Sequence, residues 1–372
     1  MTIFEYIDKY GVYTFDEVAF NEVDNAILAS ISYLDLDGYV SNNRFHKRSI
    51  RNVSGMFFKD LDGKVEGITA YKGSVKIFRL LGNTRRYGDL YLYNYFYLGD
   101  EKQQFSAIMI DINKSLVYVS YEGTDHLVIG WKEDFMMSYM FPVPSQRRAI
   151  DYLNKHSLFN NKRIILGGHS KGGNLALVAG MYANFWVKDR IIAIYNNDGP
   201  GLRKNEIESK QYKNIEDRLI HIIPNYSTVG LLLRNNGKYE VVRSSKKSIY
   251  AHDLSTWIVD DVKFERKKLS TYSEVIDKGM IEWLCKYDDD QRKKFVDSLF
   301  MIFERANVSD LNDIIANKKL IIKLVFQARD IDKETKNIIK DFIYFFFKYF
   351  KDIKVAPLFE KFKNIDEINI KE

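Results

Sequence analysis

The chain has 372 residues, of which 46% are hydrophobic and 15% aromatic, so it can bury a sizeable core and is not a disordered polymer. Its 56 basic and 50 acidic residues give a net charge of +6 and are mixed along the sequence, without the basic stripe that nucleic-acid binding requires. The single cysteine, Cys285, excludes an internal disulfide and a cysteine-rich zinc site. We therefore expect a folded protein with no nucleic-acid partner.

Two further absences bear on where the protein works. The first fifteen residues carry acidic side chains and no apolar stretch of signal-peptide length. No run of apolar residues approaches the roughly 18 that a membrane-spanning helix needs. The sequence therefore predicts a cytoplasmic protein.

The first half of the chain changes from a helical to a strand pattern. Apolar residues at spacings of three to five predict an amphipathic helix over residues 15–36. Residues 91–99, 105–112 and 115–121 are rich in aromatic and β-branched side chains, with turn residues between the last two segments, and predict three strands.

Helices and apolar strands then alternate. A helix is predicted over residues 145–158, and three buried strands over residues 163–166, 190–196 and 218–224. Strands that are apolar on both faces and separated by helices imply a mostly parallel sheet covered on both sides by helices. The predicted fold class is therefore α/β.

The pattern changes again beyond residue 262. Three long helical patterns with charged faces follow, without a strand signal among them. No Pro/Gly-rich linker separates them from the preceding residues. We expect an α/β domain over residues 1–262 and a helical C-terminal module over residues 263–372 that packs on it.

The strongest chemical signal is the stretch ILGGHSKGGNLALVAG, which contains Ser170. Gly168 and Gly172 flank the serine between an apolar strand and a helix, as a nucleophile elbow requires, and Gly173 extends the glycines. A serine attacks a carbonyl when its hydroxyl projects from such a sharp turn, a base takes its proton and backbone N–H groups bind the oxyanion. A helix-capping serine is the simpler alternative, but capping does not explain three glycines around one serine.

The sequence around this serine resembles that of class 3 lipases. GGHSKGGNLA is similar to their nucleophile region, and VSYEGTDHLVIGWKEDF at 119–135 is similar to their oxyanion segment. The two segments appear in the family's order and at roughly its spacing. The resemblance implies an α/β-hydrolase fold.

A closer likeness covers about residues 3–262. FDEVAFNEVDNAILASISYLD, NNDGPGL at 196–202, IIPNYSTVGLLL at 222–233 and SIYAHDLSTWIV at 248–259 are together similar to the Mbeg1-like family of bacterial hydrolases. That family is assigned by homology to lipase-like enzymes with poorly defined substrates.

The resemblance also implies an oxyanion site and a lid-like segment that follows it in the sequence. Thr124 matches the oxyanion residue of the lipases, so its backbone N–H would join that of Lys171, whose side chain we expect to be solvated. Trp131 and residues 135–141 fall where these lipases carry a lid, although a buried core helix would give the same pattern.

The base is expected to be His252. It follows the nucleophile in chain order near the end of the predicted sheet, which is the order of the α/β-hydrolases. His221 lies within a strand pattern and His169 directly beside the nucleophile, so we expect both to have packing roles.

The acid is where the sequence departs from the lipase pattern. The position that aligns with the lipase aspartate is Ser227, which has no carboxylate. Asp198, in the NNDGPG segment at the end of the preceding strand, is the nearest substitute, but it also fits a turn residue before Gly199 and Pro200. Asp253 is expected to cap a helix.

These observations predict a serine hydrolase of esterase or lipase type that needs no metal or cofactor. Ser170 would attack a lipid, thioester or small ester, His252 would move the proton, and Asp198 or Ser227 would orient the histidine. The alternative is a catalytically weakened hydrolase fold that binds a membrane surface or a protein. The missing acid and the aromatic run at 342–350 favour that alternative, although the run also fits a core helix.

Overall fold

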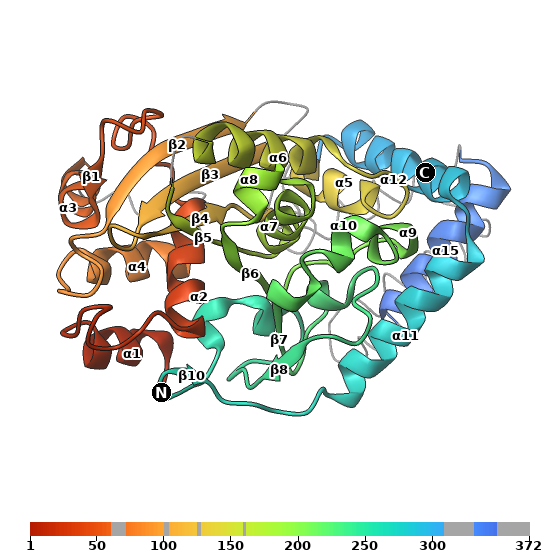
Figure 1. The fold of residues 1–372 in the computed structure, drawn as a ribbon. Coiled ribbons are helices and arrows are strands. Elements are labelled where there is room, and N and C mark those ends of the chain that lie inside the picture. Colours follow the sequence, from red (N-terminus) through yellow and green to blue (C-terminus); the bar gives the residue numbers. More distant parts are fainter. Residues whose placement is uncertain (61–71, 100–103, 125–127, 159–160, 309–330, 348–372) are drawn as a thin grey trace. The chain divides into compact units, whose positions relative to one another are not determined.

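The computed structural model describes residues 1–60, 72–99, 104–124, 128–158, 161–308 and 331–347 (Figure 1). These residues belong to two compact units. The first contains residues 1–125 and 144–273, and the second contains residues 126–143 and 274–372.

The first unit is built on an eight-stranded sheet with the strands in sequence order from β1 to β8. The strands are β1 (Arg48–Ser49), β2 (Tyr91–Gly99), β3 (Gln104–Asp111), β4 (Leu116–Tyr121), β5 (Arg163–His169), β6 (Ile191–Asn197), β7 (Leu219–Pro224) and β8 (Glu240–Val242). The pairs from β1 to β4 are antiparallel and those from β4 to β8 are parallel. With helices on its faces, this sheet has the α/β-hydrolase fold, and the predicted fold class is confirmed.

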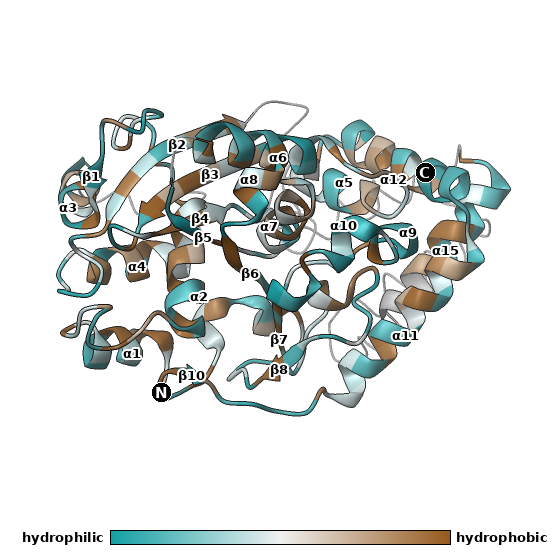
Figure 2. Ribbon diagram, in the orientation of Figure 1, coloured by the Kyte–Doolittle hydropathy of each residue, from teal (hydrophilic) through white to brown (hydrophobic). Residues whose placement is uncertain are grey.

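Neighbouring residues of the central strands face opposite sides of the sheet. Ile165 belongs to a core cluster that it shares with the N-terminal helices, whereas an added side chain on Gly180, in helix α7 (Lys171–Tyr182), would contact Leu166. Side chains alternate across a strand, so both faces of β5 are buried. Figure 2 shows the corresponding apolar colouring in the central strands.

Helices from two parts of the chain supply these layers. Those that precede β2 in the chain are α1 (Ile3–Tyr10), α2 (Glu22–Ser30), α3 (Ile50–Asp60) and α4 (Lys72–Leu81). Those that follow β4 in the first unit are α6 (Pro144–Ser157), α7 (Lys171–Tyr182), α8 (Phe185–Lys188), α9 (Lys204–Ile207) and α10 (Lys210–Lys213). The first predicted helix, over residues 15–36, is too long. The side chains of Asn21 and Asp24 form a capping box that starts α2 at Glu22, and a 3-10 turn, Ile31–Tyr33, follows it.

The second unit combines two distant stretches of chain. Its helices are α5 (Val128–Met136), most of α11 (Thr271–Lys286), α12 (Asp289–Arg305) and α15 (Lys333–Phe347). The Phe135 ring of α5 lies 6.1 Å from that of Phe295 and 5.4 Å from that of Phe342, between ring centroids. The C-terminal helices therefore share an aromatic core with a helix that is inserted between β4 and α6.

This division differs from the boundary expected at residue 262. The first unit continues through a two-stranded sheet of β9 (Val259–Asp260) and β10 (Lys263–Phe264) to Ser273. The segment with the lid-like pattern groups with the helical unit, and so does the start of the aromatic run, because Phe342 belongs to the core of that unit. Residues 348–350 of the run lie outside the described residues. In the described part of the chain, no helix combines the length and apolarity needed to cross a bilayer.

Candidate active site

Ser170 occupies a strained turn between β5 and α7. Its φ of 58° and ψ of −135° lie outside the regions that non-glycine residues favour. A side chain on Gly168 would place its Cβ 2.3 Å from the backbone of Gly172, and one on Gly172 would place its Cβ 2.1 Å from the Tyr121 carbonyl oxygen. The glycines are therefore required because α7 starts directly against the ends of β4 and β5.

The side chains of Asp198 and His252 meet at the same edge of the sheet. Asp198 follows β6, whose last residue, Asn197, pairs with His169 at the end of β5. Its carboxylate Oδ2 lies 2.6 Å from Nδ1 of His252. From the sequence, either Asp198 or Ser227 could orient the histidine. The two side chains are in contact, because the Ser227 hydroxyl donates to Oδ1 of Asp198 over 2.5 Å.

This carboxylate is fully buried. Burial raises the pKa of Asp198 above its ordinary value, while hydrogen bonds from His252, Ser227 and the backbone N–H of Gly230 oppose the shift. Since Nδ1–H of His252 donates to Asp198, the Nε2 atom of that ring is the one that can accept a proton. His252, with 16% of its side chain exposed, remains accessible.

His169 links the nucleophile turn to the backbone of His252. Its Nε2–H donates to the His252 carbonyl over 2.8 Å, and its Nδ1 accepts from the Tyr33 hydroxyl, also over 2.8 Å. Burial and the nearby His252 lower the pKa of His169 well below its usual value, which agrees with this neutral tautomer. His169 is buried beside the turn, and both of its ring nitrogens have hydrogen-bond partners.

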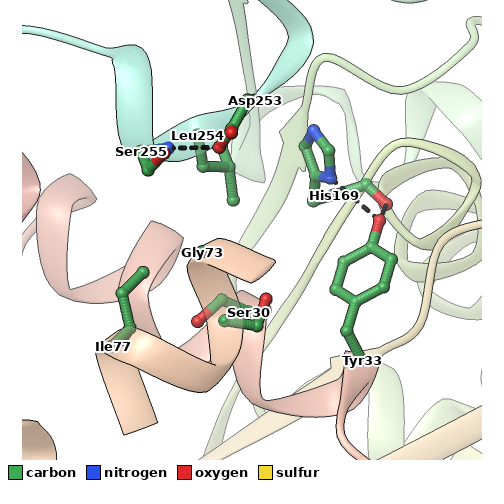
Figure 3. A pocket seen from close by; sticks show the side chains of 9 residues that line it. Ser30, Tyr33, Gly73, Ile77, His169, Asp253, Leu254 and Ser255 are labelled. Atoms are coloured by element: carbon green, nitrogen blue, oxygen red, sulfur yellow. Dashed lines mark hydrogen bonds between the residues drawn. The ribbon is translucent and has the colours of Figure 1, made fainter. Parts of the chain in front are cut away.

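Figure 3 shows His169 and Tyr33 at one side of a small cavity of about 10 Å³, which is room for about one water molecule. Residues of α4 and of the 3-10 turn Leu254–Thr256 line its other sides. Asp253 points into that turn and accepts from the Ser255 N–H over 2.8 Å, so its expected capping role is confirmed.

The residues on either side of His252 are also held in place. His252 ends a 3-10 turn, Ser248–His252, and the buried Trp257 donates through Nε1 to the Ala251 carbonyl over 3.0 Å. This contact holds the peptide group before His252, and the hydrogen bond from His169 holds the peptide group after it.

The two segments that carry the expected oxyanion residues, Thr124 and Lys171, lie beside Ser170 in the chain fold. Thr124 comes directly after Gly123, where an added Cβ would lie 3.0 Å from that of Ser170. Lys171 is the first residue of α7, so its N–H belongs to the positive end of the helix dipole.

The expectation of a solvated Lys171 side chain is wrong. That side chain is 1% exposed, and its Nζ lies 3.4 Å from the Gln104 carbonyl oxygen. The reason is that nearly every residue of α7 is buried, including its first turn.

Buried asparagines hold the turns that carry Ser170 and Asp198, and sequence reasoning did not identify them. Asn25 of α2 donates to Asn197 over 2.8 Å, and Asn197 donates to the Gly168 carbonyl over 2.9 Å. Asn196 accepts from the N–H of Gly199 over 2.9 Å and so closes the turn that carries Asp198. The two asparagines before Asp198 were visible within NNDGPGL, and a run of polar residues ending an apolar strand was the available signal.

The strand order, the strained serine after β5 and the buried carboxylate after β6 define the class of protein as an α/β-hydrolase fold. A profile of the Mbeg1-like family matches residues 81–301, more than half of the chain. The chain belongs to the Mbeg1-like family. Among solved structures, that of M37 lipase is similar, with 14% sequence identity and a TM-score of 0.35. The match covers 69% of this chain and 79% of the lipase chain. No curated protein matches the sequence.

Proposed function

We propose that the protein is a serine hydrolase that cleaves carboxylic esters through an acyl-enzyme. The observation that carries this proposal is the 2.6 Å contact between His252 and the buried Asp198, at the edge of the sheet where Ser170 occupies its strained turn. A serine needs a base, and the base needs a partner that fixes its tautomer.

In the proposed reaction, Nε2 of His252 takes the hydroxyl proton of Ser170 as its oxygen attacks the ester carbonyl. Asp198 stabilises the positive charge that forms on the imidazole. The N–H groups of Thr124 and Lys171 stabilise the oxyanion. The histidine then protonates the leaving alcohol, and water releases the acyl group by the same route.

The contact with Asp198 weakens the case for a catalytically impaired fold that only binds a membrane or a protein. That alternative was favoured by the missing carboxylate at Ser227. In the site, Ser227 supports a carboxylate supplied by the neighbouring strand. We also propose that the enzyme acts in the cytoplasm on lipid or small esters.

A fluorophosphonate probe tests the proposal, because only an activated serine reacts with it. We expect the wild type to be labelled and Ser170→Ala to lose labelling, while Ser115→Ala, which changes an exposed serine in the turn before β4, retains it. Hydrolysis of p-nitrophenyl esters of increasing acyl length would then define the substrate class. An unlabelled but folded wild type would instead favour the binding role.

A further inference from the structure

A second candidate site lies at the opposite end of the strands from Ser170. A cleft of about 630 Å³ is lined by Arg44, Phe45, Lys47, Tyr93, Lys114, Ser115, His156, Asn161 and Lys162. Ser115 and Lys162 come immediately before β4 and β5, whereas Ser170 follows β5. Since a strand of this length spans roughly 20 Å, the cleft is separate from the candidate active site.

The lining of the cleft is strongly cationic. Four of these residues, Arg44, Lys47, Lys114 and Lys162, are basic, and none of the described lining residues is acidic. Beneath them, the carboxylate of Asp111 lies 2.5 Å from Nζ of Lys47 and 2.7 Å from that of Lys162. One carboxylate between two ammonium groups leaves a positive charge, to which Arg44 and Lys114 add.

Two of the cations are fixed in place. The Lys47 ammonium lies 4.1 Å from the centroid of the Tyr93 ring, and the Tyr93 hydroxyl donates to Asp111 over 2.8 Å. Lys162 also donates to the Asn113 carbonyl over 2.9 Å, and 19% of its side chain is exposed. Such preorganised ammonium groups lose little conformational freedom when they bind an anion.

We propose that this cleft binds the phosphate group of a phosphomonoester or pyrophosphate ligand. A phosphate carries up to two charges and several acceptor oxygens, which suits several cations around one cleft better than a single carboxylate does. The amide of Asn161 adds a neutral donor group to the lining, whereas the Ser115 hydroxyl already donates to the Asn113 side chain over 3.0 Å. The phosphate could belong to a free metabolite or to a lipid headgroup.

Calorimetric titration of the full-length protein with inorganic pyrophosphate tests the free form, and sedimentation with phosphatidylcholine vesicles containing phosphatidic acid tests the lipid form. The test variant is Arg44→Gln/Lys114→Gln, which leaves both lysines on Asp111. The control is Lys204→Gln/Lys213→Gln, which removes two exposed charges from α9 and α10. A thermal unfolding curve like that of the wild type establishes that each variant is folded.

We expect binding in at least one assay, about tenfold weaker in the test variant, unchanged in the control and reduced at high salt. Binding of pyrophosphate identifies a soluble ligand, whereas binding of the acidic vesicles alone identifies a headgroup. Absence of binding in both assays would overturn the proposal, and so would equal binding by the test variant and the wild type. Labelling of Ser170 is a separate measurement, so failure of either proposal leaves the other intact.

Discussion

Asp198 has three hydrogen-bond donors from two loops around its buried carboxylate: the His252 ring, and the Ser227 hydroxyl and Gly230 N–H of the loop after β7. A buried carboxylate without such partners would take up a proton. In the proposed mechanism, the residue after β6 supplies the acid, and Ser227, which aligns with the lipase aspartate, supports it.

The first prediction concerns this carboxylate. Asp198→Asn should lower kcat for ester hydrolysis by about 10⁴, because an amide no longer selects the catalytic tautomer of His252. Ser227→Ala should cost only about tenfold, since the carboxylate remains. Steady-state kinetics on a p-nitrophenyl ester measure both changes. Asp253→Asn, which keeps a capping oxygen beside His252, serves as the control, and a similar loss in all three variants would contradict the assignment.

The second prediction concerns His169 as a positioning residue. His169→Phe removes the donor to the His252 carbonyl and should lower kcat by about ten- to a hundredfold with little change in KM. His169→Gln retains an N–H donor and should recover part of kcat. Equal kcat in the two variants would mean that packing, and not the hydrogen bond, is the contribution of His169.

At the scale of elements, the start of α7 depends on close backbone contacts. Gly172→Ala should destabilise the fold by about 3 kcal/mol or more, because the new Cβ meets the Tyr121 carbonyl of β4 and neither backbone can move independently. Gly55→Ala, at an exposed position of α3 with nothing within 4 Å of an added Cβ, should instead stabilise slightly. Urea unfolding curves measure both, and a small effect at Gly172 would show that α7 can shift.

Strand β7 carries a histidine whose environment makes stability depend on pH. Burial lowers the pKa of His221 to about 4 from its ordinary 6.5. The unfolded chain therefore binds a proton at His221 more readily than the folded protein does. The free energy of unfolding is unaffected by this group above pH 6.5 and decreases by about 3 kcal/mol as the pH falls from 6.5 towards 4. His221→Asn should reduce the fall in unfolding free energy over these pH values by about that amount. Denaturant titrations at several pH values measure it, and parallel curves would contradict it.

The sequence predicted β2, β3, β4, β6 and β7 to within a residue or so because each is a short run rich in apolar side chains, whereas β5 continues to His169, beyond its predicted end at 166, because its last residues are Gly-Gly-His. The sequence did not predict β8, which has only three residues. Glycine spacing identified Ser170 because the elbow needs small residues locally. The choice between Asp198 and Ser227 depended on which side chain reaches His252, and the burial of Lys171 depended on how completely α7 is covered. Neither is encoded in local spacing.

For the whole molecule, the second unit depends on a helix from the middle of the chain. A truncation after Ser273 would leave α5 without α12 and α15, exposing the aromatic surface around Phe135. We expect this fragment to aggregate. Replacing residues 126–143 in the same fragment by a Gly-Ser linker of equal length should restore solubility, as size-exclusion chromatography would show. Equal solubility of the two fragments would mean that α5 needs no partner.

The same division of the helical unit has a consequence for synthesis on the ribosome. Helix α5 leaves the ribosome well before the helices that cover Phe135, since Phe295 follows it by 160 residues and Phe342 by 207. At roughly 5–20 residues per second, the apolar side of α5 stays uncovered for about ten seconds or longer. Throughout that interval it is open to chaperones and to neighbouring nascent chains, and α5 reaches its final environment only when translation is nearly complete.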